Sequence, residues 1–91
     1  MGQPTLSDAF RELLPLSNDW RSIGTLLGFE EGKLDQISVK NNHNANDSLK
    51  ALLNEWLDHA RPPTWKSLID AIQPLNNEIA KLLAKKYHIA E

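Results

Sequence analysis

Apolar residues recur every three or four positions along most of this chain, which is the spacing of an amphipathic helix. The pattern is clearest where five large side chains follow the i, i+3, i+4, i+7, i+8 order: Leu49, Leu52, Leu53, Trp56 and Leu57. The opposite stripe is polar and consists of Asp47, Lys50, Asn54, Asp58 and Arg61. Asn46 or Asp47 is the expected N-cap, and the Pro62-Pro63 pair ends the pattern. The sequence therefore predicts one long helix with a single buried face.

The first helix is predicted over residues 6–14. Its apolar face consists of Leu6, Phe10, Leu13 and Leu14. Thr5 is placed to cap it, with Asp8 three residues later as in a capping box. Pro15 is expected to end the helix, because proline cannot continue the hydrogen-bond ladder.

A second helix is expected to run from a cap at Ser17 or Asn18 to about Leu27. Its apolar set consists of Trp20, Ile23 and Leu27, with Leu26 beside them. Gly28 follows at the position where helices favour a left-handed residue.

The third helix is shorter and spans about residues 30–39, with Leu34 and Ile37 inward. Glu30 and Glu31 at its start favour the positive end of the helix dipole. Gly32 weakens it by about 1 kcal/mol relative to alanine. A polar, asparagine-rich loop over residues 40–46 follows.

Two further helices follow the Pro62-Pro63 pair. Thr64 is expected to cap the fifth, whose inward residues are Trp65, Leu68, Ile69 and Ile72, and Pro74 ends it. Asn76 or Asn77 begins the sixth. Its pattern places Ile79, Leu82 and Leu83 inward and Glu78, Lys81 and Lys85 outward.

These elements predict an all-α fold, because no strand alternation of useful length occurs. Six short helices with short connections are expected to form a compact bundle. A chain of 91 residues is one domain, so we expect a single domain over residues 1–91. Trp20, Trp56 and Trp65 all fall at inward positions, and we expect them in the core and not at a ligand-stacking surface.

Composition removes several classes of function. The chain has no cysteine, which excludes disulfides, thiolate nucleophiles and cysteine-based zinc sites. No apolar run approaches the length of a membrane span, and no signal-peptide pattern is visible at the N-terminus. The net charge of −2 does not indicate nucleic acid or a membrane surface.

No catalytic, cofactor or metal site is predicted. The histidines His43, His59 and His88 have no neighbours that suggest a triad or a convergent set of metal ligands. The Gly24–Gly28 segment lacks the lysine of a phosphate-binding loop. Asn46-Asp47-Ser48 matches a glycosylation sequon, but capping of the long helix explains it better. We therefore expect a protein that is not an enzyme; an enzyme fragment or a regulatory helical domain is a further alternative.

A small helical nucleic-acid-binding domain is the main alternative function. Lys81, Lys85 and Lys86 make the last helix basic. Nucleic-acid binders are usually basic overall, however, and here Glu78 and Glu91 flank the patch. A solvated helical face, or a charged docking patch for another protein, fits the pattern better.

The order of these motifs resembles that of the death domains. The series Trp20-x-x-Ile23-Gly24-x-x-Leu27-Gly28-Phe29, followed by an acidic pair and Leu34-Asp35-x-Ile37, is similar to the family's second and third helices. The Trp56-Leu57 pair resembles the end of its fourth helix, and Pro63-Thr64-Trp65 the start of its fifth. The resemblance covers about residues 5–88. Gly32 and the asparagine-rich loop depart from the pattern in surfaces that vary within the family.

This resemblance implies a six-helix antiparallel bundle with Greek-key order. It also implies a noncatalytic protein–protein interaction module without cofactors. Such modules bind other death-fold domains, including copies of themselves, in cytoplasmic signalling for apoptosis and innate immunity. Some assemble into helical oligomers, in which one patch docks onto a different patch of the next copy.

The resemblance further implies where partners would bind. One contact pairs the first and fourth helices with the second and third. Another pairs the end of the fourth helix with the loop before the sixth and the start of the sixth. The charged residues predicted there are Arg21, Glu31, Lys33 and Asp35, then Asp47, Lys50, Asp58 and Arg61, and finally Glu78, Lys81 and Lys85.

Overall fold

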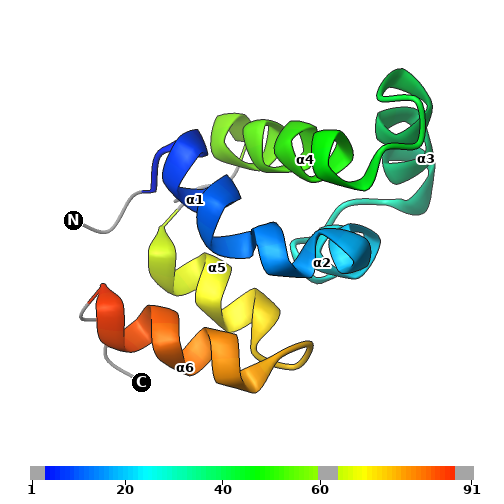
Figure 1. Ribbon diagram of the computed structural model, residues 1–91. Helices are drawn as coiled ribbons and strands as arrows, with labels where there is room; N and C mark the ends of the chain where they lie inside the picture. The colour runs from blue at the N-terminus through cyan, green and yellow to red at the C-terminus, as the bar shows by residue number, and fades with distance from the viewer. Residues whose placement is uncertain (1–3, 60–63, 88–91) are drawn as a thin grey trace.

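The computed structural model describes residues 4–59 and 64–87. Within these ranges the chain forms six α-helices, one 3-10 helix and no strand, which confirms the predicted all-α class. The helices are α1 (Leu6–Leu13), η1 (Leu14–Asp19), α2 (Trp20–Leu26), α3 (Glu31–Lys40), α4 (Ala45–His59), α5 (Trp65–Ile72) and α6 (Asn77–Lys86). Figure 1 shows their arrangement.

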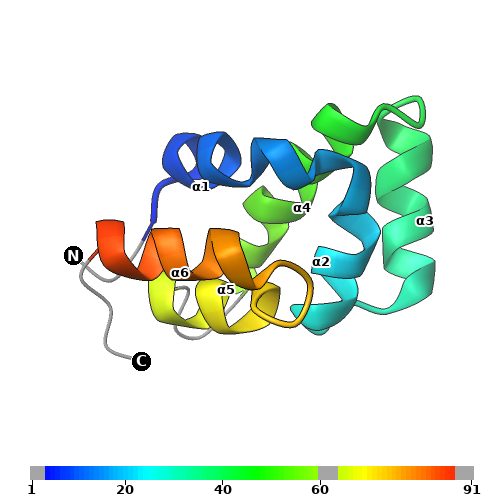
Figure 2. The same ribbon diagram turned by 60° about the horizontal axis from the view of Figure 1, so that its bottom comes forward.

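The long helix α4 is the centre of the bundle. It packs against α1, η1, α2 and α3, while α5 packs against both α6 and α2. Figures 1 and 2 place α3 at one end of the molecule and the α5–α6 pair at the other. The molecule measures 36 × 24 × 21 Å along its principal axes, with a Cα radius of gyration of 12.2 Å.

One hydrophobic core joins all the helices. Trp20, Trp56 and Trp65 are all buried in it, as the apolar pattern predicts. The indole ring of Trp65 also stacks on the phenol ring of Tyr87, with ring centroids 4.0 Å apart. Residues from every helix contribute to the same cluster, which includes Ala9, Ile23, Leu34, Leu52, Ile72 and Leu83.

A hydrogen bond and an ion pair connect the C-terminal end of α6 to α1. Tyr87 donates its phenol hydrogen to Glu12 Oε2 at 2.8 Å, and the Lys86 ammonium pairs with the same oxygen. Only 15% of the Glu12 side chain is exposed. Partial burial raises the pKa of Glu12, but the hydrogen bonds and the Lys86 charge outweigh it and leave this pKa below its ordinary value.

Three of the predicted N-caps are confirmed. The side-chain oxygens of Thr5, Thr64 and Asn76 accept hydrogen bonds from the backbone N–H three residues later. Asp8 does not complete a capping box in the first helix, since its carboxylate pairs with Arg11 at 2.9 Å.

Two predicted helix starts are wrong. Asn44, and not Asn46 or Asp47, caps α4: its Oδ1 accepts from the Asp47 N–H at 2.9 Å. Ser17 and Asn18 do not cap the second helix, because they lie inside the 3-10 helix that precedes α2. Pro15 stands at the start of that 3-10 helix, where its missing N–H costs no hydrogen bond.

Two leucines predicted to face inward are exposed instead. Leu14 lies where α1 gives way to η1, so the helical phase changes at that position. Leu82 projects from α6 with 66% of its surface exposed. Ala80 and Ala84 occupy the inward positions beside Leu83. Small alanines carry little periodic signal, which is why the pattern of large residues assigned the wrong face to Leu82.

Candidate protein-interaction surface

The predicted interaction residues lie on three parts of the surface, formed by α2 with α3, by α4, and by α6. All those that the structure describes are exposed except Lys33, which is half-buried. Arg61 lies outside the described residues.

On the first part, the structure brings Arg21 and Asp35 together. The guanidinium of Arg21 on α2 lies 2.9 Å from Asp35 Oδ1 on α3 and 5.2 Å from the ring centroid of Trp20. Both partners are largely exposed, so the ion pair contributes only ~0–1 kcal/mol to stability. These two predicted contact residues therefore join α2 to α3 through a weak surface contact. Glu31 forms no ion pair within residues 4–59 and 64–87.

Lys33 reaches a residue that sequence reasoning missed. Its ammonium lies 2.6 Å from Glu55 Oε1 on α4, and the other carboxylate oxygen of Glu55 lies 3.2 Å from His59 Nε2. The hydrogen bond from Lys33 is the main cause that lowers the pKa of Glu55. Glu55 and His59 are four residues apart on one helix, and this spacing in the sequence could have predicted their contact. No local pattern points to Lys33, which lies more than twenty positions away along the chain.

An apolar hollow of about 360 Å³ opens beside this ion-pair network. We call its apolar lining residues, Leu27, Phe29 and Trp56, the floor of the hollow, and its polar lining residues, Glu30, Lys33 and His59, the rim. The turn at Gly28 shapes it: the φ of +96° there is a left-handed conformation that glycine adopts without strain. The N–H groups of Gly28 and Phe29 bond the carbonyls of Thr25 and Gly24 at 3.0 and 2.9 Å, which is a Schellman motif.

The second part of the surface lies at the start of α4. Asp47 and Lys50 line a shallow depression together with residues of α1, α4 and the loop after α3: Leu6, Asn41, Ala51 and Asn54. Asp58 is exposed near the other end of α4. The structure therefore separates the predicted α4 residues into two places.

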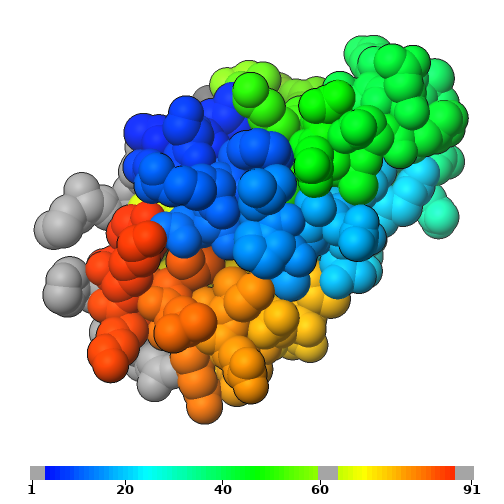
Figure 3. Space-filling model, viewed as in Figure 1, coloured from blue at the N-terminus to red at the C-terminus, as the bar shows by residue number. Residues whose placement is uncertain are grey.

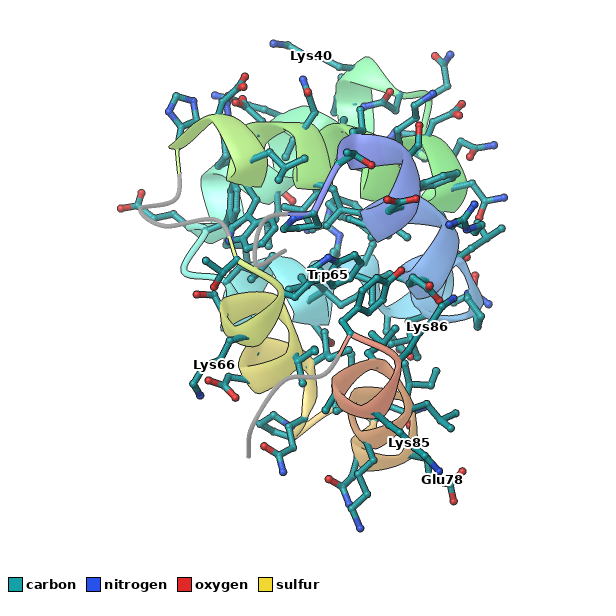
Figure 4. All side chains as sticks on the ribbon, turned by 90° about the vertical axis from the view of Figure 1, so that its left-hand side faces the viewer. Lys40, Trp65, Lys66, Glu78, Lys85 and Lys86 are labelled. Carbon is teal, nitrogen blue, oxygen red and sulfur yellow. The ribbon has the colours of Figure 1, made fainter. Side chains whose placement is uncertain are left out.

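The third part is the outward stripe of α6. Glu78, Lys81, Leu82 and Lys85 are all exposed and follow the i, i+3, i+4, i+7 spacing of one helical face. Within the described residues none of the three charged side chains forms an ion pair. Figure 3 shows α6, in orange to red, over the lower front of the molecule. Figure 4 shows the side chains of Glu78 and Lys85 pointing away from the body of the molecule, while the Lys86 side chain lies toward α1.

The described histidines lie at the surface. His43 has a φ of +59°, and its Nδ1 lies 2.9 Å from the hydroxyl of Ser38. Among the residues that the structure covers, no three His, Asp or Glu side chains converge in a way that could hold a metal ion. No helix in the same residues is both long enough and apolar enough to cross a membrane.

Comparison with known proteins identifies the family pattern over nearly the whole chain. The family model described as "Death domain" matches residues 5–86. Neither the curated proteins nor the solved structures compared with this chain give a match.

Proposed function

Because the chain belongs to the death-domain family, whose members are protein-interaction modules, we propose that it associates with other death-fold domains and with copies of itself. The setting of this association would be cytoplasmic signalling in apoptosis or innate immunity. The charged residues on α2–α3, on α4 and on α6 would be its contact residues, and Arg61 belongs to the same proposed set.

The observation that best supports this proposal is the separation of exposed charges of both signs on different helices. Glu78, Lys81 and Lys85 on α6 have no ion-pair partner within the described residues, and neither has Glu31 on α3. Distinct patches favour a heterologous contact, in which one patch docks onto another patch of the next molecule. Such charges determine partner choice and association rate more than affinity.

Light scattering across protein concentration and salt tests this proposal. We expect the purified domain to self-associate or to bind members of a panel of death-fold domains, and we expect salt to weaken the contact by screening its charges. A strict monomer that binds no member of the panel would contradict the proposal.

Charge reversal locates the contact on the surface. We expect Lys81→Glu to weaken association, and we expect the same of Arg61→Glu. Lys40→Glu is the matched control, because Lys40 is an exposed lysine at the end of α3 and its reversal alters the net charge equally. If all three variants weaken association equally, net charge and not a defined surface controls it.

A further inference from the structure

The outward face of α6 carries an exposed leucine among charged side chains. Leu82 is 66% exposed in the middle of the stripe, with Lys81 beside it and Glu78 and Lys85 one turn away on either side. An isolated exposed leucine is ordinary in a protein surface. Leu82, however, is framed by charges that have no ion-pair partner in the part of the chain that the structure describes.

The hollow beside α3 offers a complementary surface. Its floor is apolar, because it consists of the side chains of Leu27, Phe29 and Trp56. Its rim carries Glu30, which is exposed and has no ion pair within the described residues, and Lys33. An apolar floor with a charged rim is the arrangement that an apolar side chain flanked by charges would fill.

The charges on the two surfaces also match in spacing. On α6 an acid precedes a base by three residues, Glu78 and Lys81, and on the rim Glu30 precedes Lys33 by the same interval. Residues three apart in a helix lie on one face within one turn. Glu30 is the N-cap of α3, and its carbonyl accepts from the Lys33 N–H at 3.1 Å, so these two residues also lie one turn apart. An antiparallel placement of the two segments therefore brings Lys81 to Glu30 and Leu82, the next residue, to Phe29. Glu78 then lies toward Lys33, whose ammonium also pairs with Glu55.

We infer that the α6 stripe of one molecule docks onto the α3 hollow of a second copy of this chain, with Leu82 inserted against Phe29 and Trp56. This inference rests on the proposed function and names one surface pair for it. Figures 1 and 2 show α3 and α6 at opposite ends of the molecule, so the contact is head to tail. A head-to-tail contact leaves one unused surface at each end, and further copies can add there.

Substitution of the leucine tests the apolar part of the contact. Leu82→Asp is expected to lower the self-association constant by about 10- to 100-fold, the equivalent of losing one buried leucine. The fold of the monomer should persist, because Leu82 is exposed, and tryptophan fluorescence during denaturant unfolding checks this. Val39→Asp is the matched control: Val39 is 64% exposed on α3 and does not line the hollow, so its association should match that of the wild type.

A charge swap tests the register. Lys81→Glu and Glu30→Lys should each weaken self-association by roughly threefold or more. Each substitution places two side chains of the same charge opposite each other at the rim. The double variant carrying both changes should recover most of the loss. Recovery supports the pairing of Lys81 with Glu30, and a double variant weaker than either single one overturns it.

Failure of this inference differs from failure of the proposed function. If the domain self-associates and Leu82→Asp associates as the wild type does, the surface pair is wrong while the function stands. If the domain does not self-associate but binds another death-fold domain, the inference is again overturned and the function stands. Loss of every association overturns both.

Discussion

At the scale of single residues, Glu12 is the clearest case of a side chain whose role depends on its ionisation. Tyr87 and Lys86 both donate to its carboxylate, so these contacts favour the charged form over the protonated one. The pKa of Glu12 is lowered in the folded chain. Its contribution to stability is therefore complete above the ordinary carboxyl pKa of about 4.5 and is lost as the pH falls through the lower folded value.

Glu12→Gln should therefore destabilise the domain in a pH-dependent way. We expect a loss of about 1–2 kcal/mol at neutral pH, because a neutral amide oxygen replaces the charged acceptor of these hydrogen bonds. The difference from the wild type should shrink as the pH falls below the ordinary carboxyl pKa of about 4.5 and through the lower folded value, because wild-type Glu12 becomes protonated there. Denaturant unfolding at several pH values measures it. Glu31→Gln, at an exposed acid with no ion pair in the described residues, should change little, and a pH-independent effect of Glu12→Gln would contradict this account.

Two glycines should respond in opposite ways to alanine. A Cβ at Gly24 would lie 2.5 Å from Leu34 Cδ2 and 3.2 Å from Leu52 Cδ1, both in the core. Gly24→Ala should therefore cost about 1–3 kcal/mol through overpacking. A Cβ at Gly32 would meet nothing within 4 Å, so Gly32→Ala should stabilise α3 by up to about 1 kcal/mol. Unfolding free energies that change in the same direction in both variants would contradict this reading.

At the scale of elements, local chemistry made most helices predictable. The starts of α1, α5 and α6 follow from Thr5, Thr64 and Asn76, because an N-cap acts within three residues. The sequence did not predict the 3-10 helix before α2. Pro15 by itself indicates only the end of a helix, whereas Leu16 packs into the core, and that tertiary contact cannot be inferred from local sequence. The Lys33–Glu55 pair and the hollow join elements distant in sequence, so periodicity could not indicate them.

Removal of a cap should destabilise the helix that it begins. Thr64→Ala should cost about 0.5–2 kcal/mol, because it removes the capping hydrogen bond from the Ser67 N–H to Thr64 Oγ1, which measures 3.2 Å. Asp19 precedes α2 without a side-chain capping bond, so Asp19→Ala should change stability by less than about 0.5 kcal/mol. Thermal unfolding of both variants gives the comparison. Equal losses would mean that the capping bond is not the cause.

At the scale of the whole molecule, the inferred head-to-tail contact determines how assemblies grow. Leu82→Asp leaves the α3 hollow intact, and Glu30→Lys leaves the α6 stripe intact. Each variant alone should associate more weakly than the wild type, but an equimolar mixture should favour heterodimers, because the intact stripe of one variant meets the intact hollow of the other only in that pair. Analytical ultracentrifugation distinguishes these dimers from the longer oligomers expected of the wild type. A mixture that associates no more strongly than either variant alone would refute the head-to-tail arrangement.

The stack of Trp65 on Tyr87 gives this bundle a spectroscopic reporter of its own. The chain contains a single tyrosine, whose ring lies 4.0 Å from an indole, so energy transfer should quench its emission in the intact fold. Detachment of the end of α6 would restore tyrosine emission, while the other two indoles continued to report on the core. The two signals would separate local opening of the last helix from global unfolding without any added label.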